Sequence, residues 1–208
     1  MLSCAIFGCG GHGRVVAEIA ELNGYQNIAF FDDQWPRVTS NKHWNVVGDM
    51  STLQRVAKQY DLVIVAVGNN VLRYNIQREL RDLGAIFKVT VHPTATISQY
   101  SVIKPGSVVM ANAVVNPFCN IGESCIINSG SIVEHDCNIG HAVHISPGSN
   151  LAGGVSVGDY SWIGIGSQIK QLVRIGTEVV VGAGSTVVKD VPNFFTVLGS
   201  PARRFIKN

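Results

Sequence analysis

Residues 131–154 read SIVEHDCNIGHAVHISPGSNLAGG, a stretch in which an aliphatic side chain returns at every sixth position. The same step continues in both directions through the second half of the chain. Its sixteen members are Ile97, Ile103, Val109, Val115, Ile121, Ile127, Val133, Ile139, Ile145, Leu151, Val157, Ile163, Ile169, Ile175, Val181 and Val187. A six-residue period of this kind predicts a parallel β-helix, in which each hexad supplies one short strand and one turn.

Three hexads make one coil of such a helix, so residues 18 apart should stack at about the 4.8 Å spacing of neighbouring strands. Sixteen hexads then form roughly five coils, or about 25 Å of prism. The unbroken register predicts that no loop is inserted. Because a prism cannot close its own ends, we expect the N-terminal segment and the tail VLGSPARRFIKN (197–208) to cap it.

The first 91 residues carry a different pattern, in which short apolar runs alternate with helical stretches. Strands are expected at 2–8, 27–33, 61–68 and 87–91, and helices at 14–24, 51–60 and 71–85. This order predicts a small Rossmann-like α/β domain over residues 1–91, followed by the β-helix domain over residues 92–208. Ligands of such sheets bind at the carboxyl ends of the strands. Those ends carry the glycine turn FGCGGHGR (7–14), then Asp32 and Asp33, then Gly68, Asn69 and Asn70.

Composition narrows the classes of partner. The formal net charge is +2, only 14% of residues are charged and no basic tract occurs, which argues against binding to nucleic acid or to an anionic membrane. No signal-peptide pattern and no run of 18 apolar residues is present, so we expect a soluble, cytoplasmic protein. Five cysteines without zinc-finger spacing are expected to stay reduced there.

The stacking rule places His135 in a column with Pro117, Gly153 and Gln171. An imidazole would then lie one coil from the backbone N–H of Gly153. A base beside a free main-chain donor is what acyl transfer requires, because one group removes a proton and the other stabilises the oxyanion. The alternative is that His135 is merely an exposed turn residue.

Two further histidines fall in the same stretch. His141 stacks between Glu123 and Asp159, which favours an exposed charged ladder, whereas His144 stacks between Ile126 and Trp162 and could line a pocket or simply pack. The three histidines fall at different heights and corners, so zinc binding by one subunit is not expected, whereas zinc binding across a subunit interface stays open.

Cysteine chemistry is not expected to contribute to the reaction. Cys119 and Cys137 stack in one interior column, where they are interpreted as small apolar fillers. A covalent intermediate on cysteine is therefore disfavoured, and direct attack on a thioester is expected.

The hexad repeat with the ending GSPARR resembles the left-handed β-helix acyltransferases. The stretches FGCGGHGR, FFDD, NSGSIVEHDCNIG, HISPGSNLAGGVSVG and VVGAGSTVVKDVP make it similar to one branch of them. That branch contains N-acetyltransferases of nucleotide-linked 4-amino-4,6-dideoxy sugars and sialic acid O-acetyltransferases. The resemblance implies a homotrimer with active sites between subunits, acetyl-CoA as cosubstrate, no metal, and a role in surface glycan biosynthesis.

The resemblance also assigns residues. It implies that His135 is the general base and Asp136 the carboxylate that orients it, with Glu134 as the competing choice. Acetyl-CoA would be bound by the set His144, Gly153, Trp162, Ile165 and Ala183.

The glycine turn would hold the diphosphate of a nucleotide sugar, because glycines let the backbone approach a pyrophosphate at a helix N-terminus. Residues expected to bind the nucleotide sugar are Gly10, Gly11, His12, Gly13, Arg14, Asp32, Asp33, Gly68 and Asn69. Arg14 could instead lie on the helix surface. About 90 residues are too few for the two halves of a full dinucleotide fold.

Two other functions fit the same features. One is O-acetylation of sialic acid or another sugar hydroxyl. The other is an NAD-type regulatory protein in which the β-helix serves only as an oligomerisation scaffold. The EHD and LAGG segments favour the amine acceptor modestly.

Overall fold

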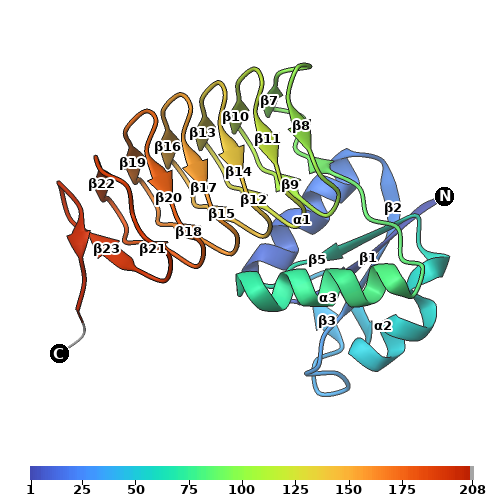
Figure 1. Ribbon diagram of the computed structural model, residues 1–208. Coiled ribbons are helices and arrows are strands. Elements are labelled where there is room, and N and C mark those ends of the chain that lie inside the picture. The colour runs from blue at the N-terminus through green and yellow to red at the C-terminus, as the bar shows by residue number, and fades with distance from the viewer. Residues whose placement is uncertain (207–208) are drawn as a thin grey trace. The chain divides into compact units, whose positions relative to one another are not determined.

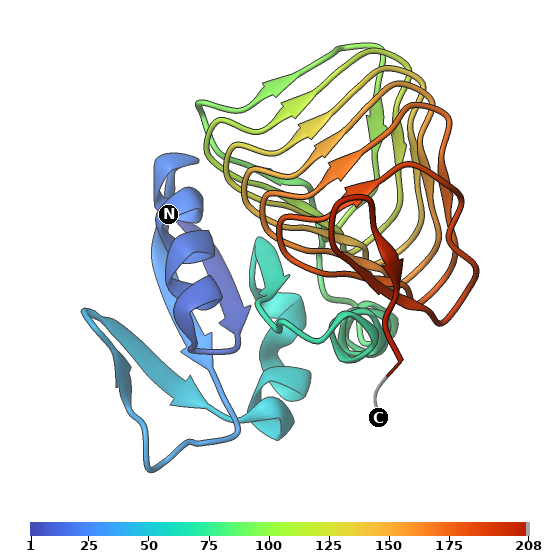
Figure 2. The same ribbon diagram turned by 90° about the vertical axis from the view of Figure 1, so that its left-hand side faces the viewer.

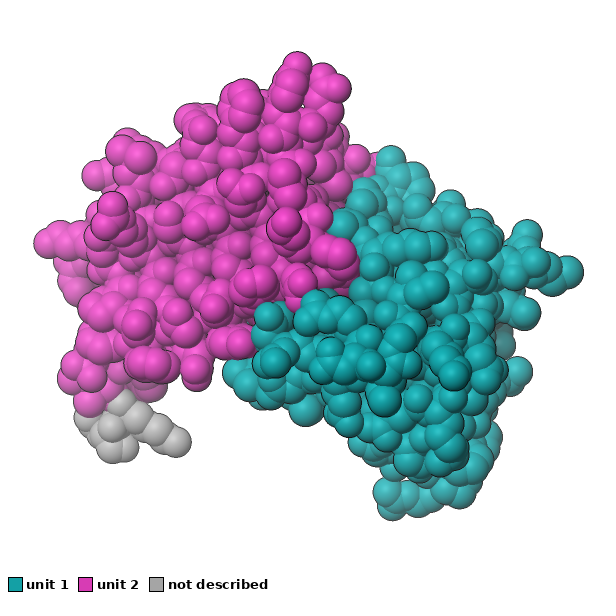
Figure 3. Space-filling model, turned by 45° about the vertical axis from the view of Figure 1, so that its right-hand side comes forward, with its two compact units in different colours: residues 1–93 teal, residues 94–208 magenta. Residues whose placement is uncertain are grey.

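The computed structural model describes residues 1–206, so the last two residues of the predicted tail cap lie outside the described part. The chain divides into two compact units, Met1–Pro93 and a second unit that begins at Thr94 (Figure 3). The division falls two residues beyond the predicted boundary.

Unit 1 alternates strands and helices in the predicted order (Figure 1). Its elements are β1 (Leu2–Phe7), α1 (Gly11–Leu22), β2 (Tyr25–Phe31), β3 (Ser40–Asn41), β4 (Trp44–Gly48), α2 (Met50–Val56), the 3-10 helix η1 (Ala57–Gln59), β5 (Leu62–Val65), α3 (Asn70–Asp82) and β6 (Thr90–Val91). The antiparallel hairpin of β3 and β4 was not predicted, and the strand expected at 87–91 is reduced to its last two residues.

The sheet of unit 1 has the strand order β3-β4-β2-β1-β5. Strand β1 pairs in parallel with β2 on one side and with β5 on the other. One face packs Ala5 and Phe7 of β1 against Leu53 of α2 and Ile76 and Leu80 of α3. From β1 the chain continues to β2 on one side of β1 and later returns to β5 on the other side. A crevice is therefore expected between the carboxyl ends of β1 and β5.

Unit 2 is a left-handed parallel β-helix with three flat faces, and its coils are seen nearly end-on in Figure 2. The first face holds β7 (Thr96–Ile97), β10 (Val114–Val115), β13 (Ile132–Val133), β16 (Asn150–Leu151), β19 (Gln168–Ile169) and β22 (Thr186–Val187). The second holds β8 (Val102–Ile103), β11 (Asn120–Ile121), β14 (Asn138–Ile139), β17 (Ser156–Val157) and β20 (Arg174–Ile175). The third holds β9 (Val108–Val109), β12 (Ile126–Ile127), β15 (His144–Ile145), β18 (Trp162–Ile163), β21 (Val180–Val181), β23 (Thr196–Leu198) and β24 (Arg203–Arg204).

The predicted stacking by 18 residues is confirmed. On the first face Val115 pairs with Val133, and Val133 pairs with Leu151. The register holds without insertion from Ile97 to Val187, and the ladder residues from Val109 onward are buried along the axis. Beyond Val187 the chain loses two residues from its coil, because Val181 pairs with Val197. The antiparallel pair of β23 and β24 ends the third sheet.

From Gly106 to Gly184, each corner of the prism is made by a residue in the left-handed conformation, three positions after the ladder residue. Glycine fills this place at Gly130, Gly148 and Gly166, whereas Asp136 fills it with φ of 60°. Aspartate tolerates this conformation better than most side chains, because its short polar group bonds locally. In the described residues no helix is long and apolar enough to cross a membrane.

Candidate active site

His135 lies at the corner that joins the first face to the second, in the turn between β13 and β14. Two backbone hydrogen bonds fix the turn, one from Asp136 N–H to the Pro117 carbonyl at 3.0 Å and one from Gly154 N–H to the His135 carbonyl at 2.9 Å. The turn is thus held by the coil on each side. The side chain of His135 is 60% exposed and points outward from this rigid backbone.

The imidazole of His135 is paired with Asp136. Nδ1 of His135 lies 2.7 Å from Oδ2 of Asp136. An ionised carboxylate only accepts, so Nδ1 carries the proton and the Nε2 lone pair is left free to act as a base. The hydrogen bond to Asp136 raises the pKa of His135, and the charge of Glu134 adds a smaller effect in the same direction. Between the two carboxylates considered, the structure places Asp136 in contact with the ring.

Gly153 lies directly beside the His135 ring, as the stacking rule requires. A Cβ atom at Gly153 would come within 2.6 Å of the ring atoms Cε1 and Nε2, so only glycine leaves room for the imidazole. Neighbouring amides are engaged, since Ala152 N–H donates to the Ile169 carbonyl and Gly154 N–H donates to His135. Within residues 1–206 the Gly153 N–H has no acceptor.

The next corner of the prism provides an internal comparison. There the N–H of Glu123 donates to Nδ1 of His141 at 3.1 Å, and the N–H of His141 donates to Oδ1 of Asp159 at 2.7 Å. The interpretation of His141 as part of an exposed charged ladder is therefore wrong, because its ring accepts a backbone hydrogen bond. Side chains cap the turn amides at this corner, whereas Gly153 has no side chain to cap the amide of His135.

A cavity of about 400 Å³ lies on the third face and the corner that follows it. Its lining includes four residues predicted to bind acetyl-CoA, namely His144, Trp162, Ile165 and Ala183. The rings of His144 and Trp162 lie 4.6 Å apart at 38°. The His144 ring accepts a hydrogen bond from Asn128, and the indole N–H of Trp162 donates to Ser146 at 2.8 Å. His144 is thus both packed and pocket-lining.

The predicted site residues of unit 2 form two groups in one chain. His135, Asp136 and Gly153 share the corner between the first and second faces, whereas Trp162 and Ala183 belong to the cavity on the third face. Gly153 is therefore separated from the other residues predicted to bind acetyl-CoA. Among the described residues no group of three His, Cys, Asp or Glu side chains is arranged to hold a metal ion.

The glycine turn of unit 1 connects β1 to α1. Gly8 has φ of 104°, and Gly10 caps α1 without a side chain. A Cβ atom at Gly13 would collide with the Gly8 carbonyl, so the turn can close tightly only with glycine there. Gly10, Gly11 and Gly13 thus present the N-terminal amides of α1 without side chains over them, an arrangement suited to an anionic group.

The carboxylates after β2 are already used by the backbone. Asp32 accepts from the N–H of Cys9 at 2.9 Å and from that of Gln34 at 3.0 Å, and Asp33 accepts from Met50 at 3.2 Å. Partial burial is the largest influence on Asp32 and raises its pKa, yet these N–H donors bring the pKa below its usual value. Asp32 therefore holds the glycine turn in place, a role that the sequence reading missed.

Arg73 is a buried residue of unit 1 that the sequence reading also missed. Its guanidinium donates to the carbonyls of Val67 and Gly68 at 3.0 and 3.3 Å and to Oδ1 of Asn70 at 2.8 Å. Burial and the Arg73 charge together lower the pKa of His12 to about 4, so His12 is neutral at physiological pH. The signal in the sequence was the position of Arg73 on the buried face of α3, three residues before Ile76.

The other predicted nucleotide-binding residues fall into two places. Asn69 caps α3 by accepting from the N–H of Leu72 at 2.9 Å, next to Gly68 at the end of β5. Arg14 instead donates to Asn41 at 3.2 Å and lines a separate hollow with Trp44. Arg14 is exposed on α1, and its Nη2 would lie 3.8 Å from a Cβ atom at Gly11, so its guanidinium is near the glycine turn.

A hexapeptide β-helix that carries an exposed histidine–aspartate pair and an aromatic cavity defines the class of hexapeptide acyltransferases. Residues 3–80 match the family model of the PglD N-terminal domain. The chain is 39% identical to the acetyltransferase domain of PglB from Neisseria gonorrhoeae, solved in complex with acetyl coenzyme A, with a TM-score of 0.94 and 98% of each chain covered. PerB from Caulobacter crescentus, solved in complex with CoA and GDP-perosamine, is 37% identical with a TM-score of 0.93, covering 98% of this chain and 97% of that one.

A curated relative extends the comparison. The UDP-N-acetylbacillosamine N-acetyltransferase of Bacillus subtilis is 35% identical over 114 residues, which is 53% of this chain and 52% of the relative. The matched part thus spans about half the length of that protein. The chain belongs to the PglB and PerB family of hexapeptide acetyltransferases, and its own residues 3–80 match the PglD N-terminal domain.

Proposed function

We propose that the protein is an acetyl-CoA-dependent N-acetyltransferase that modifies the amino group of a nucleotide-linked 4-amino-4,6-dideoxy sugar in glycan biosynthesis. The observation that carries the proposal is the His135 ring, whose Nδ1 is held by Asp136 while Nε2 lies over Gly153. The related PerB was solved with CoA and GDP-perosamine, and the related PglB domain with acetyl coenzyme A.

The proposed reaction is a direct transfer in a ternary complex. The neutral amine attacks the thioester carbonyl, so a C–N bond forms while Nε2 of His135 takes the proton from nitrogen. The Gly153 N–H donates to the developing oxyanion, which a preorganised amide stabilises without rearrangement. The C–S bond then breaks, and CoA leaves as a thiol after taking the proton from His135. Asp136 keeps the imidazole in the required tautomer throughout.

Unit 1 would bind the nucleotide part of the acceptor. The N-terminal amides of α1, presented by Gly10, Gly11 and Gly13, would receive the diphosphate. Asp33, Gly68 and Asn69 lie at the carboxyl ends of the strands and would contact the sugar or base, with His12 as a neutral hydrogen-bonding group. Asp32 would act mainly by holding the turn. Arg14, whose guanidinium lies near Gly11, would contact the phosphate or the sugar.

The remaining parts of the proposal concern assembly and location. A homotrimer with sites between subunits would bring the His135 corner of one prism to the cavity of the next. Exposed apolar side chains at the His135 corner support such an interface, namely Tyr100, Phe118 and Leu172.

Five free thiols favour a reducing, cytoplasmic compartment. No nucleic-acid or membrane partner is proposed.

The experiment that tests the chemistry is the substitution His135→Ala, with His141→Ala as the matched control. Release of CoA thiol would be followed with acetyl-CoA and a panel of nucleotide amino sugars. Loss of a positioned base should lower kcat about 10²- to 10⁴-fold in His135→Ala. Calorimetric binding of the nucleotide sugar should change little, and His141→Ala should retain turnover. Unchanged turnover in His135→Ala would exclude His135 as the base.

A parallel assay distinguishes the amine acceptor from a hydroxyl acceptor. The same enzyme would be given two acceptors in place of the amino sugar: sialic acid, and the nucleotide sugar in which a hydroxyl group replaces the amine. We expect thiol release only with the amine. Turnover on the hydroxyl compounds alone would favour O-acetylation.

A further inference from the structure

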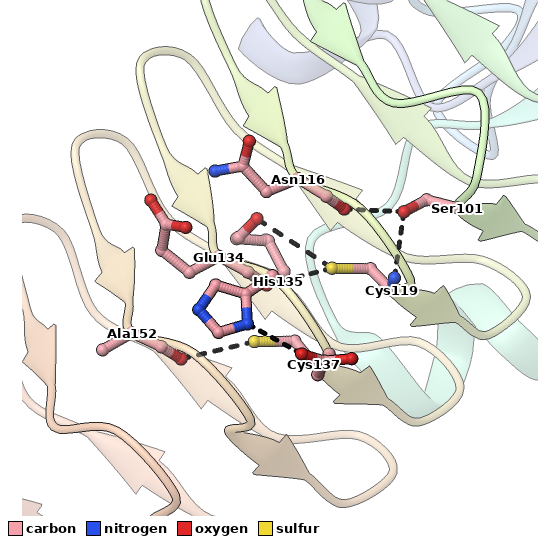
Figure 4. A network of polar contacts seen from close by, with 9 residues as sticks. Ser101, Asn116, Cys119, Glu134, His135, Cys137 and Ala152 are labelled. Atoms are coloured by element: carbon pink, nitrogen blue, oxygen red, sulfur yellow. Dashed lines mark hydrogen bonds and ion pairs between the residues drawn. The ribbon is translucent and has the colours of Figure 1, made fainter.

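An inward column of small side chains lies directly beneath the His135 corner. Its members at successive coils are Ser101, Cys119, Cys137, Val155 and Val173, each two residues before a ladder residue. The first three donate to a carbonyl 15 residues further on, as Figure 4 shows. The two cysteines are buried in the interior as predicted, and each thiol in addition donates a hydrogen bond that was not predicted.

These bonds reach the two peptide groups that matter for the proposed reaction. Cys119 donates to the Glu134 carbonyl at 3.0 Å, which belongs to the peptide that leads into His135. Cys137 donates to the Ala152 carbonyl at 3.4 Å, which belongs to the peptide whose N–H is that of Gly153. A trans peptide is planar, with its C=O and N–H pointing in opposite directions. Fixing the Ala152 carbonyl inward therefore directs the Gly153 N–H outward, toward the His135 ring.

We propose that Cys137 is a positioning residue of the active site, which orients and polarises the Ala152–Gly153 peptide so that the Gly153 N–H meets the oxyanion. Hydrogen bonds in series strengthen one another, so a donor on the carbonyl makes the amide hydrogen a better donor. Cys119 plays the corresponding part for the peptide that carries His135. This inference rests on the proposed function, because the oxyanion role of Gly153 belongs to that proposal.

Two properties of Cys137 suit this role. Its side chain is buried, so the hydrogen bond has little competition from water. A hydrogen bond with the Cys119 sulfur, followed by burial, raises the pKa of Cys137 well above its usual range, so the thiol remains protonated. All five cysteines are free, so this proton is not lost to a disulfide.

The repeat supplies a matched control. Cys125 makes an equivalent bond at the next corner, donating at 3.0 Å to the Gly140 carbonyl, whose peptide leads into His141. Valine already occupies both inward columns, at Val155 beside Cys137 and at Val143 beside Cys125. Cys137→Val and Cys125→Val therefore remove one S–H donor each with a side chain that the fold accepts.

The test compares steady-state kinetics of Cys137→Val, Cys125→Val and Cys137→Ser. Full loss of an oxyanion donor costs about 10²- to 10³-fold in kcat, so misorientation of the retained donor should cost about tenfold in Cys137→Val. The KM values for acetyl-CoA and nucleotide sugar should stay within about twofold, because an oxyanion contact is made in the transition state only. Cys137→Ser should restore kcat, and Cys125→Val should keep wild-type kcat.

Two results would overturn the inference: a wild-type kcat in Cys137→Val, or an equal loss in Cys137→Val and Cys125→Val. If Cys137→Val does not fold, Cys137→Ala replaces it as the variant without a donor, and Cys137→Ser remains the variant that keeps one. Cys125→Ala and Cys125→Ser are then the matched controls. His135→Ala assayed alongside separates the two proposals. Retained turnover in His135→Ala refutes the proposed function, whereas lost turnover there with full turnover in Cys137→Val refutes this inference alone.

Discussion

The residue on which the proposed chemistry depends is His135, and its tautomer follows from a single neighbour. Because Asp136 accepts from Nδ1 at 2.7 Å, the lone pair of Nε2 is free to take the proton of the amine in the proposed reaction. The same carboxylate raises the pKa of His135, which makes the ring a stronger base. At low pH the raised pKa lowers the rate, because His135 can act as a base only while its ring is unprotonated.

This balance predicts the effect of Asp136→Asn on the pH profile. Asp136 raises the pKa of His135, so its removal lowers that pKa, and the acidic limb of kcat/KM should move to lower pH. The plateau of kcat should fall about tenfold or more, because the amide binds Nδ1–H less firmly and stabilises the imidazolium less. The measurement is kcat/KM across the acidic and neutral range.

Glu134→Gln is the control for Asp136→Asn. The charge of Glu134 raises the pKa of His135 less than Asp136 does. The acidic limb of kcat/KM in Glu134→Gln should therefore move in the same direction as in Asp136→Asn, but by less. An acidic limb in Asp136→Asn that stays in place or moves to higher pH contradicts the assignment.

Single residues also show where sequence reasoning succeeds and where it stops. The approach of His135 to Gly153 could be predicted, because stacking by 18 residues follows from backbone geometry alone. The hydrogen bonds of Asp32 and Cys137 could not be predicted, because they depend on which backbone groups the folded turns leave unpaired. A periodic pattern fixes Cα positions more firmly than it fixes side-chain partners.

At the scale of elements, the loop between β5 and α3 depends on a buried arginine. Arg73 joins the carbonyls of Val67 and Gly68 to the side chain of Asn70, which shapes the strand end nearest the glycine turn. The three bonds use the planar fork of the guanidinium. Lysine, with a compact ammonium group, cannot reproduce that geometry.

We therefore predict that Arg73→Lys lowers the free energy of unfolding by about 2–4 kcal/mol, because buried acceptors lose their donor. The KM for the nucleotide sugar should rise, since the loop lies at the predicted binding edge. Urea unfolding and steady-state kinetics measure the two effects. Arg78→Lys, on the exposed side of the same helix, should change the stability by less than about 0.5 kcal/mol. Equal effects of the two substitutions would show that Arg73 has no special structural role.

The elements of unit 1 were predicted less completely than those of unit 2. Two-residue strands such as β3 carry no periodicity to detect, and the stretch at 87–91 is apolar in sequence but pairs only at Thr90 and Val91. In unit 2 the repeat is long enough for each hexad to confirm the others, and the predicted register was correct from Ile97 to Val187. The shortened last coil lies where the repeat ends.

At the scale of the whole molecule, one chain separates the two groups of residues that the proposed reaction uses. The corner of His135 and the cavity of Trp162 and Ala183 belong to different edges of the same prism. Tyr100 and Phe118 stack their rings 5.7 Å apart at the His135 corner and are both exposed, which is typical of a surface that another subunit covers. A cyclic trimer would join unlike edges of neighbouring prisms.

Subunit mixing tests this arrangement. We predict that His135→Ala and Ala183→Trp are each nearly inactive, the first for lack of a base and the second because the indole fills the cavity of about 400 Å³. When the two are refolded together at equal amounts, a site between subunits is intact if its His135 comes from the second variant and its cavity from the first. Random assembly makes about a quarter of the sites intact, so about a quarter of wild-type turnover should return.

The control for refolding itself mixes His135→Ala with the variant that carries both substitutions. No turnover should return in this mixture, because no subunit then carries His135. Native mass spectrometry would establish that mixed oligomers have formed; mixed oligomers without recovered turnover would place the complete site within one chain, and the separation of the two edges would then need another explanation.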